Sequence, residues 1–230
     1  MKLTKRLNEI AGMVNNNSIV ADIGTDHGYI PKFLIDKEIA KMVIATDISK
    51  GSLDKTIGYI EEENLSDYIN ARLGDGLDPI KPFEVDTIII AGMGGLLIAE
   101  ILETNKKKLD SYIEYILQPM VGADELRKYL TNNGFRIIDD KVVREGDKFY
   151  EVIKAVREIF RVDDEIEYEI SPLWQEDDDN TWKEMINNRL QLLFKVKEEL
   201  EDKDSIKSRE RLEEILFKIS KYKEVLKIED

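Results

Sequence analysis

The stretch VADIGTDHGYIP, residues 20–31, follows an apolar run with two aspartates, two glycines and the only histidine of the chain. The run that leads into it, SIVADIG, is typical of a buried strand that ends at a glycine. Residues 29–37 have the pattern of a helix, with Pro31 in the first turn, where its missing N–H costs least. Strand, loop and helix in this order form the repeating unit of an open parallel sheet.

The same unit recurs along the first 160 residues. Further apolar runs of strand length cover residues 41–49, 68–77, 85–95 and 112–119, and helical patterns cover 3–14, 52–64, 96–104 and 124–132. Residues 135–157 contain two strand-like runs joined by Glu-Gly-Asp-Lys, which is typical of a β-hairpin. We therefore predict an α/β fold in which a parallel sheet, covered by helices on both faces, ends in an antiparallel hairpin.

The pattern changes from about Val162. An acidic connector that includes QEDDDN leads to two segments with apolar stripes at helical spacing, one from Trp182 to Leu200 and one from Leu212 to Leu226. These segments predict an α-helical hairpin of the coiled-coil type, which either packs as an ordinary amphipathic pair or serves as a binding device. We place the domain boundary between residues 160 and 161, giving units 1–160 and 161–230.

Composition limits the classes of protein to consider. The 230 residues are 42% hydrophobic and include no cysteine, no apolar run long enough for a bilayer and no charged-then-apolar leader. A cytoplasmic protein without disulfides is expected, and no motif for a metal site stands out. The net charge of -14 disfavours indiscriminate binding to polyanions, so we expect no DNA and no membrane partner.

The loop after the first strand predicts the ligand. Ligands of open parallel sheets bind at the carboxyl ends of the strands. This loop lacks the G-x-G-x-x-G spacing of a dinucleotide site, and Asp22 and Asp26 would repel a pyrophosphate. S-adenosylmethionine carries an ammonium and a sulfonium but no phosphate, so nearby carboxylates would attract it. The sequence therefore predicts S-adenosylmethionine as the cofactor.

Three further loops have side chains suited to this cofactor. Asp47, about 20 residues after the first loop, can accept hydrogen bonds from both ribose hydroxyls. Asp75 can accept from the adenine amino group, Gly76 leaves room for the ring, and Met93 in AGMGG can form an apolar wall beside the methyl group. Acidic residues at strand ends also act as caps or turn formers, which remains the alternative for each loop alone. The predicted cofactor-binding residues are Asp22, Gly24, Asp47, Ile48, Asp75, Gly76, Gly92 and Met93.

The motifs VADIGTDHGYIP, ATDIS, RLGDGLDPI, TIIIAGMGG, YILQP and GDKFYEV occur in this order. With the helical hairpin that follows, the chain resembles the bacterial tRNA adenine(22)-N1 methyltransferases, closely over about the first 155 residues and in architecture beyond. The resemblance implies a Rossmann-like, seven-stranded class I methyltransferase sheet, S-adenosylmethionine as donor and a coiled-coil appendage that helps to hold tRNA. The family usually has asparagine after LQP, where this chain has Met120.

The implied reaction is methyl transfer to N1 of the adenine at position 22, which leaves a positive charge on the ring. A carboxylate nearby would stabilise that charge, and Asp26 is the candidate. His27 would orient it or accept a proton, although a lone histidine also commonly caps a turn, and Tyr29 would stack on the base. We expect a monomer with tRNA as its partner. Candidate RNA contacts are Lys2, Lys5 and Arg6, then Lys106, Lys107 and Lys108, then Lys203, Lys207, Arg209 and Arg211.

Other classes of function stay open at this point. A nicotinamide-dependent oxidoreductase would share the sheet, but the missing middle glycine and the acidic loop disfavour it. A noncatalytic protein could keep the donor pocket and bind a protein partner with its helical hairpin. The donor loops also do not identify the acceptor, so another RNA position or a small molecule remains an alternative.

Overall fold

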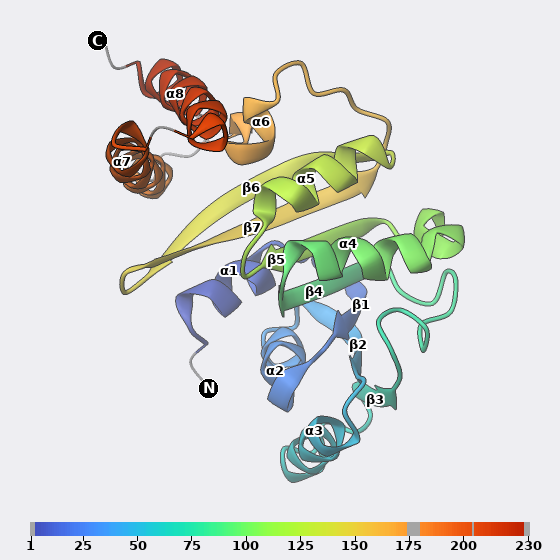
Figure 1. Cartoon of the computed structure of the whole chain (residues 1–230). Coiled ribbons are helices and arrows are strands. Elements are labelled where there is room, and N and C mark those ends of the chain that lie inside the picture. Colours follow the sequence, from blue (N-terminus) through green and yellow to red (C-terminus); the bar gives the residue numbers. More distant parts are fainter. Residues whose placement is uncertain (1–2, 174–179, 204, 228–230) are drawn as a thin grey trace. The chain divides into compact units, whose positions relative to one another are not determined.

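The computed structural model describes residues 3–173, 180–203 and 205–227. The chain forms two compact units, Met1–Ser171 and Pro172–Asp230. The first contains a seven-stranded sheet in the order β3-β2-β1-β4-β5-β7-β6 (Figure 1). The first five strands are parallel, and the hairpin of β6 and β7 joins β5 in antiparallel pairing, which confirms the predicted fold class. The strands are β1 (Ser18–Ile23), β2 (Ala40–Asp47), β3 (Ile69–Leu73), β4 (Thr87–Met93), β5 (Glu114–Pro119), β6 (Phe135–Glu145) and β7 (Lys148–Arg157).

The predicted helices of the first unit are all present. They are α1 (Lys5–Gly12), α2 (Tyr29–Asp36), α3 (Lys50–Glu62), α4 (Gly95–Thr104) and α5 (Ala123–Asn132). The structure adds a short α6 (Ile166–Glu169) and two 3-10 turns, η1 (Asp26–Gly28) and η2 (Lys106–Ser111). Side-chain oxygens cap two of the helices, because Thr4 accepts from Leu7 N and Ser49 accepts from Ser52 N.

Two apolar clusters cover the two faces of the sheet. Successive side chains of a strand point to opposite faces, so Ile88 and Ile90 of β4 join one cluster while Ile89 joins the other. The first cluster includes α4 and α5, and the second includes α1, α2 and α3 (Figure 1). The central strands are buried from both sides, which explains why they read as continuous apolar runs.

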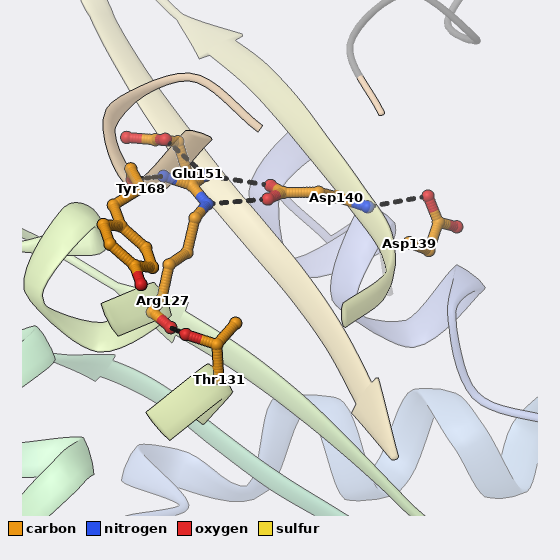
Figure 2. Close-up of polar contacts among 6 residues, drawn as sticks. All are labelled: Arg127, Thr131, Asp139, Asp140, Glu151 and Tyr168. Atoms are coloured by element: carbon orange, nitrogen blue, oxygen red, sulfur yellow. Dashed lines mark hydrogen bonds and ion pairs between the residues drawn. The ribbon is translucent and has the colours of Figure 1, made fainter. Parts of the chain in front are cut away.

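A buried ionic cluster joins α5 to the hairpin and to α6. Figure 2 shows the Arg127 guanidinium between Asp140 of β6 and Glu151 of β7. Arg127 Nε lies 2.8 Å from Asp140 Oδ2, and Nη2 lies 2.6 Å from Glu151 Oε2. Arg127 Nη1 also donates to the Tyr168 carbonyl oxygen at 3.1 Å. The two carboxylates raise the pKa of the buried guanidinium and keep it charged. This bond to α6 places residues 161–171 with the first unit, so its boundary lies beyond our predicted division at residue 160.

The second unit contains the two predicted helices, α7 (Thr181–Glu201) and α8 (Ile206–Leu226), which contact each other. The apolar stripe of α7 is buried at Trp182, Met185, Ile186 and Leu190, and that of α8 at Ile215, Ile219 and Tyr222. The predicted acidic connector QEDDDN falls almost entirely on residues 174–179, outside the described residues, and coiled-coil geometry stays a prediction. Across the described residues, every helix is too short or too polar to span a bilayer.

Candidate donor site

A cavity of about 810 Å³ opens at the carboxyl ends of the parallel strands. We call it the donor cavity. All eight predicted cofactor-binding residues line it, and so do two of the three predicted catalytic residues, Asp26 and Tyr29. His27 is not among the lining residues. The loops after β1, β2, β3 and β4 meet here because parallel strands end at one edge of their sheet.

The first loop is held in place by backbone hydrogen bonds. The N–H groups of Gly24 and Thr25 both donate to the Thr46 carbonyl oxygen of β2, at 2.8 and 2.9 Å. Gly24 has φ 75°, and a Cβ built on it would lie 2.5 Å from Met93 Cε. The positive φ favours glycine at this position, while the contact involves only the end of the flexible Met93 side chain.

Asp22 is the buried acidic group of this site. Its side chain lies at the end of β1, and the residue is 3% exposed. Burial raises the pKa of Asp22 to about 6, the Thr25 hydroxyl opposes this rise, and the negative charge of Asp47 adds to it. A cationic ligand in the cavity would favour the ionised carboxylate, so Asp22 is suited to bind an ammonium group.

The loops after β2 and β3 also line the cavity. Asp47 Oδ1 accepts from Ser49 N at 2.7 Å, which orients the carboxylate while its remaining lone pairs stay available for ribose hydroxyls. Gly76 has φ 48°, and a Cβ there would lie 3.0 Å from Ile101 Cγ2. Gly76 and Ile101 thus provide a narrow apolar surface for a planar ring, with the exposed Asp75 carboxylate at its edge.

The predicted catalytic residues form a contiguous exposed group. Asp26 Oδ1 lies 2.6 Å from His27 Nδ1, with side chains that are 79% and 45% exposed, respectively. The imidazole stacks on Tyr29, with ring centroids 5.5 Å apart and planes inclined by 14°, and Tyr29 meets Tyr59 edge to face. Asp26 and His27 both have positive φ, at 21° and 67°, so the loop holds them in a conformation that is unusual for these residues.

The structure adds cavity residues that we did not predict. Arg6 of α1, Thr46 and Met120 line the donor cavity, and Gln118 of β5 bonds to Arg6 behind its wall. Among the described residues, the buried Thr46 hydroxyl oxygen has no hydrogen-bond partner. The sequence could have indicated a role for Gln118, because a polar side chain within an apolar, fully buried strand needs a hydrogen-bond partner. For Arg6 the sequence suggested a surface contact with RNA instead.

One predicted set of RNA contacts is partly used by the fold. Lys108 Nζ donates to the carbonyl oxygens of Leu77 and Ile80, at 2.6 and 3.0 Å. Desolvation lowers the pKa of this lysine, and its ammonium is committed to the loop between β3 and β4. Lys106 pairs with Glu103 on the surface. The cluster at residues 106–108 therefore offers fewer available cations than its sequence suggested.

The donor cavity fits S-adenosylmethionine. Its lining includes four aspartates and one cationic side chain, Arg6, among the described residues. This balance suits a ligand that combines two positive groups with one carboxylate. The narrow surface at Gly76 and Ile101 suits its adenine, and Asp47 suits its ribose. Within residues 3–173, 180–203 and 205–227, no three metal-ligating side chains come together as a metal site would require.

The fold and this site define a Rossmann-like class I methyltransferase, and a methyltransferase-domain family matches residues 3–153. The tRNA (adenine(22)-N(1))-methyltransferase of Bacillus subtilis (strain 168) is 41% identical over 155 residues, which are 67% of this chain and 65% of that protein. The chain belongs to the tRNA (adenine(22)-N1)-methyltransferase family.

Solved structures extend the similarity to the whole chain. The crystal structure of B. subtilis TrmK, an m1A22 tRNA methyltransferase, has a TM-score of 0.89 and 31% identity, with 99% of each chain covered. M. capricolum TrmK in complex with S-adenosyl-homocysteine has a TM-score of 0.85 and 25% identity, again over 99% of each chain. A Streptococcus pneumoniae protein in complex with S-adenosyl-L-methionine has a TM-score of 0.86 and 29% identity, over 98% of this chain and 100% of that one.

Proposed function

We propose that this protein transfers a methyl group from S-adenosylmethionine to N1 of adenine 22 in tRNA. The main support for this proposal is the donor cavity, because residues of the four predicted loops line it together with Asp26 and Tyr29. The 41% identity to a tRNA (adenine(22)-N(1))-methyltransferase supports the choice of acceptor. The cavity is lined by residues of a single chain, so we also propose that the monomer is sufficient for activity.

The chemistry makes modest demands on the protein. Bound S-adenosylmethionine supplies an electrophilic methyl group. N1 of adenine keeps a free lone pair at neutral pH, so the protein need not generate the nucleophile and contributes by positioning it. N1 lies on the Watson–Crick edge, and the base must therefore be unpaired or extruded before it reaches the cavity. Gly92 and Met93 line the cavity at the end of β4 and would bound the space beside the methyl group.

Asp26 is the proposed catalytic residue. Methylation gives the adenine ring a positive charge, and a carboxylate beside it stabilises the transition state or accepts a proton from N6 as the charge develops. His27 holds the Asp26 carboxylate through its Nδ1 at 2.6 Å, which makes His27 a positioning residue in this proposal. In the free protein water screens the exposed Asp26. A bound tRNA would exclude that water and strengthen the interaction.

The stacked rings beside Asp26 suit an extruded base. Tyr29 is 40% exposed, with the His27 ring stacked on it and Tyr59 in edge-to-face contact, so its ring is held in place while part of it stays accessible. A base stacked on an aromatic ring gains about 1–3 kcal/mol without regard to sequence. Specificity for one adenine would then depend on the shape of the tRNA and on where the helical hairpin holds it.

The first experiment is transfer of labelled methyl from S-adenosylmethionine to unmodified tRNA, with nucleoside analysis. We expect 1-methyladenosine with tRNA that has adenine at position 22, and none when that adenine is replaced by guanine. Donor binding without transfer to tRNA would contradict the proposed acceptor and favour a small molecule or a noncatalytic role. Methylation of both tRNAs would contradict the position.

The Asp26→Ala variant tests the proposed catalytic residue. Loss of a group that assists proton transfer or stabilises charge should lower kcat by about 100-fold or more, while the Kd for S-adenosylmethionine changes by less than about twofold. Asp54→Ala, which removes an exposed carboxylate of α3, is the matched control and should leave kcat unchanged. Equal losses of kcat and donor affinity in Asp26→Ala would reassign Asp26 to cofactor binding.

A further inference from the structure

Four large apolar side chains lie exposed beside the donor cavity. Leu96 and Leu97 lie in the first turn of α4, and Met120 and Val121 directly follow β5. We call these four residues the apolar rim; their exposed fractions lie between 43% and 72%. Leu97 and Met120 also line the donor cavity, so the apolar rim is continuous with the donor site. Exposed apolar side chains that gather beside a site commonly mark a contact with a partner.

Backbone contacts join the two halves of the apolar rim. Met120 N donates to the Met93 carbonyl oxygen at 2.7 Å. Gly95 N donates to the Val121 carbonyl oxygen at 2.8 Å. A Cβ on Gly95 would collide with the Gly122 carbonyl oxygen, so glycine allows the start of α4 to lie against the loop after β5. The loops after β4 and β5 therefore hold each other, and the apolar rim is one surface.

The charges near the apolar rim indicate which part of a tRNA suits it. Asp124 and Glu125, in the first turn of α5, are exposed carboxylates shortly after Val121. Together with the four aspartates of the donor cavity, they repel phosphate groups. The faces of bases are uncharged, and apolar side chains can pack against them or insert between them. The apolar rim therefore suits bases, while the sugar-phosphate backbone is better placed away from it.

The apolar rim lies beside the space that an extruded base would enter. The strand order places β4 between β1 and β5, so the loop with Asp26 and Tyr29 and the loop after β5 flank the end of β4. Met93, at that end, lines the cavity. When an adenine is extruded into this space, the bases that were stacked on it stay outside and expose their faces. Leu96 and Val121 are the rim residues that do not line the cavity, so they are available to the RNA outside it.

We propose that Leu96 and Val121 form an apolar wedge that packs against the bases flanking the extruded adenine and keeps the tRNA open. The inference rests on the proposed function, since it takes a base of tRNA as the acceptor. Extrusion of a base costs unstacking free energy, and apolar side chains placed against the exposed base faces offset that cost. Leu96 and Val121 are positioning residues, because they act on the RNA outside the cavity and not on the reacting atoms.

The test compares two substrates that differ in how much opening they need. One is folded tRNA, and the other is the same tRNA with the partners of position 22 substituted so that its adenine is already unpaired. We measure kcat/KM for the wild-type protein, Leu96→Ser, Val121→Ser and Ile113→Ser. Ile113 is 64% exposed and precedes β5 at the end opposite Val121, which makes it the matched control. The two wedge variants should lose at least about tenfold in kcat/KM on folded tRNA and less than about threefold on opened tRNA, whereas Ile113→Ser should match the wild type on both.

A second measurement observes the opening directly. With 2-aminopurine next to position 22, fluorescence should rise when wild-type protein or Ile113→Ser saturates the tRNA, because the neighbouring base loses its stacking partner. The rise should be smaller with Leu96→Ser and Val121→Ser. Calorimetry should give unchanged affinity of these variants for S-adenosylmethionine, since neither residue lines the donor cavity.

The outcomes separate this inference from the proposed function. Equal losses of kcat/KM on the two tRNAs would overturn the wedge and indicate a general contact with RNA. Unchanged kcat/KM in both wedge variants would also overturn it and would assign the apolar rim to a protein partner. In both cases methylation by the wild-type protein leaves the proposed function standing. If the wild-type protein methylates neither tRNA, the proposed function fails together with the inference.

Discussion

Replacing Asp22 by asparagine should stabilise the protein at neutral pH and impair its donor site. The pKa of the buried carboxyl is raised from 3.8 to about 6, so burial disfavours its charged form. Between pH 3.8 and about pH 6 the native state binds more protons than the unfolded state, and the free energy of unfolding therefore falls as the pH rises. Because each pKa unit is worth 1.36 kcal/mol, a pKa raised by about 2 lowers the free energy of unfolding by about 3 kcal/mol at pH 8.

The pH dependence of stability distinguishes the free-energy cost of the buried, ionised carboxylate from a packing effect. Asparagine has nearly the same shape as aspartate but cannot ionise. The free energy of unfolding of Asp22→Asn should therefore exceed that of the wild type by up to about 3 kcal/mol at pH 8, by about half of that at pH 5 and by almost nothing below pH 4. The assay is urea unfolding of both ligand-free proteins at several pH values, with Asp54→Asn as an exposed control. A difference between Asp22→Asn and wild type that does not change with pH would refute the reasoning.

The same carboxylate links donor binding to pH. An ammonium group favours the ionised form of Asp22, so the Kd for S-adenosylmethionine should rise as the pH falls below about 6 and approach tenfold per pH unit. Calorimetric titrations between pH 5 and pH 8 measure this slope. The Asp22→Asn variant should bind weakly at every pH, and a variant that retained wild-type affinity would show that Asp22 is not a donor ligand.

Three further predictions concern other parts of the molecule. Gly24→Ala puts a side chain at φ 75° in the first loop and should weaken donor binding at least about tenfold in calorimetry. Gly58→Ala, in the open middle of α3, should leave donor binding unchanged. Arg127→Met removes the guanidinium that pairs with the buried Asp140 and Glu151 and should lower the free energy of unfolding by about 3–5 kcal/mol in urea. A loss below about 1 kcal/mol would contradict the role of the cluster. Affinity for tRNA, measured by filter binding, should fall steeply between about 50 and 200 mM salt, and a flat response would argue against phosphate contacts.

The donor cavity shows how much of a site can be predicted from local sequence pattern. Asp22, Asp47 and Asp75 could be assigned to one site from the sequence because each follows an apolar strand, and parallel strands expose their carboxyl ends at the same edge. The structure places all three on the lining of one cavity. His27 was placed with them by sequence proximity, yet its side chain contacts the cavity residues Asp26 and Tyr29 and does not line the cavity itself.

The sequence by itself determined the elements, the parallel sheet with its terminal hairpin and the loops that form the donor site. These features depend on the periodicity of apolar residues and on turn residues within about ten positions, which can be read locally. Only the tertiary structure decided the strand order, the contact between Arg6 and Gln118 and the use of Lys108 by the fold. Arg6 and Gln118 are 112 residues apart, and such a contact forms only when α1 packs beside the end of β5. The raised pKa of Asp22 likewise comes from burial by surrounding strands, since burial depends on the completed packing of the sheet.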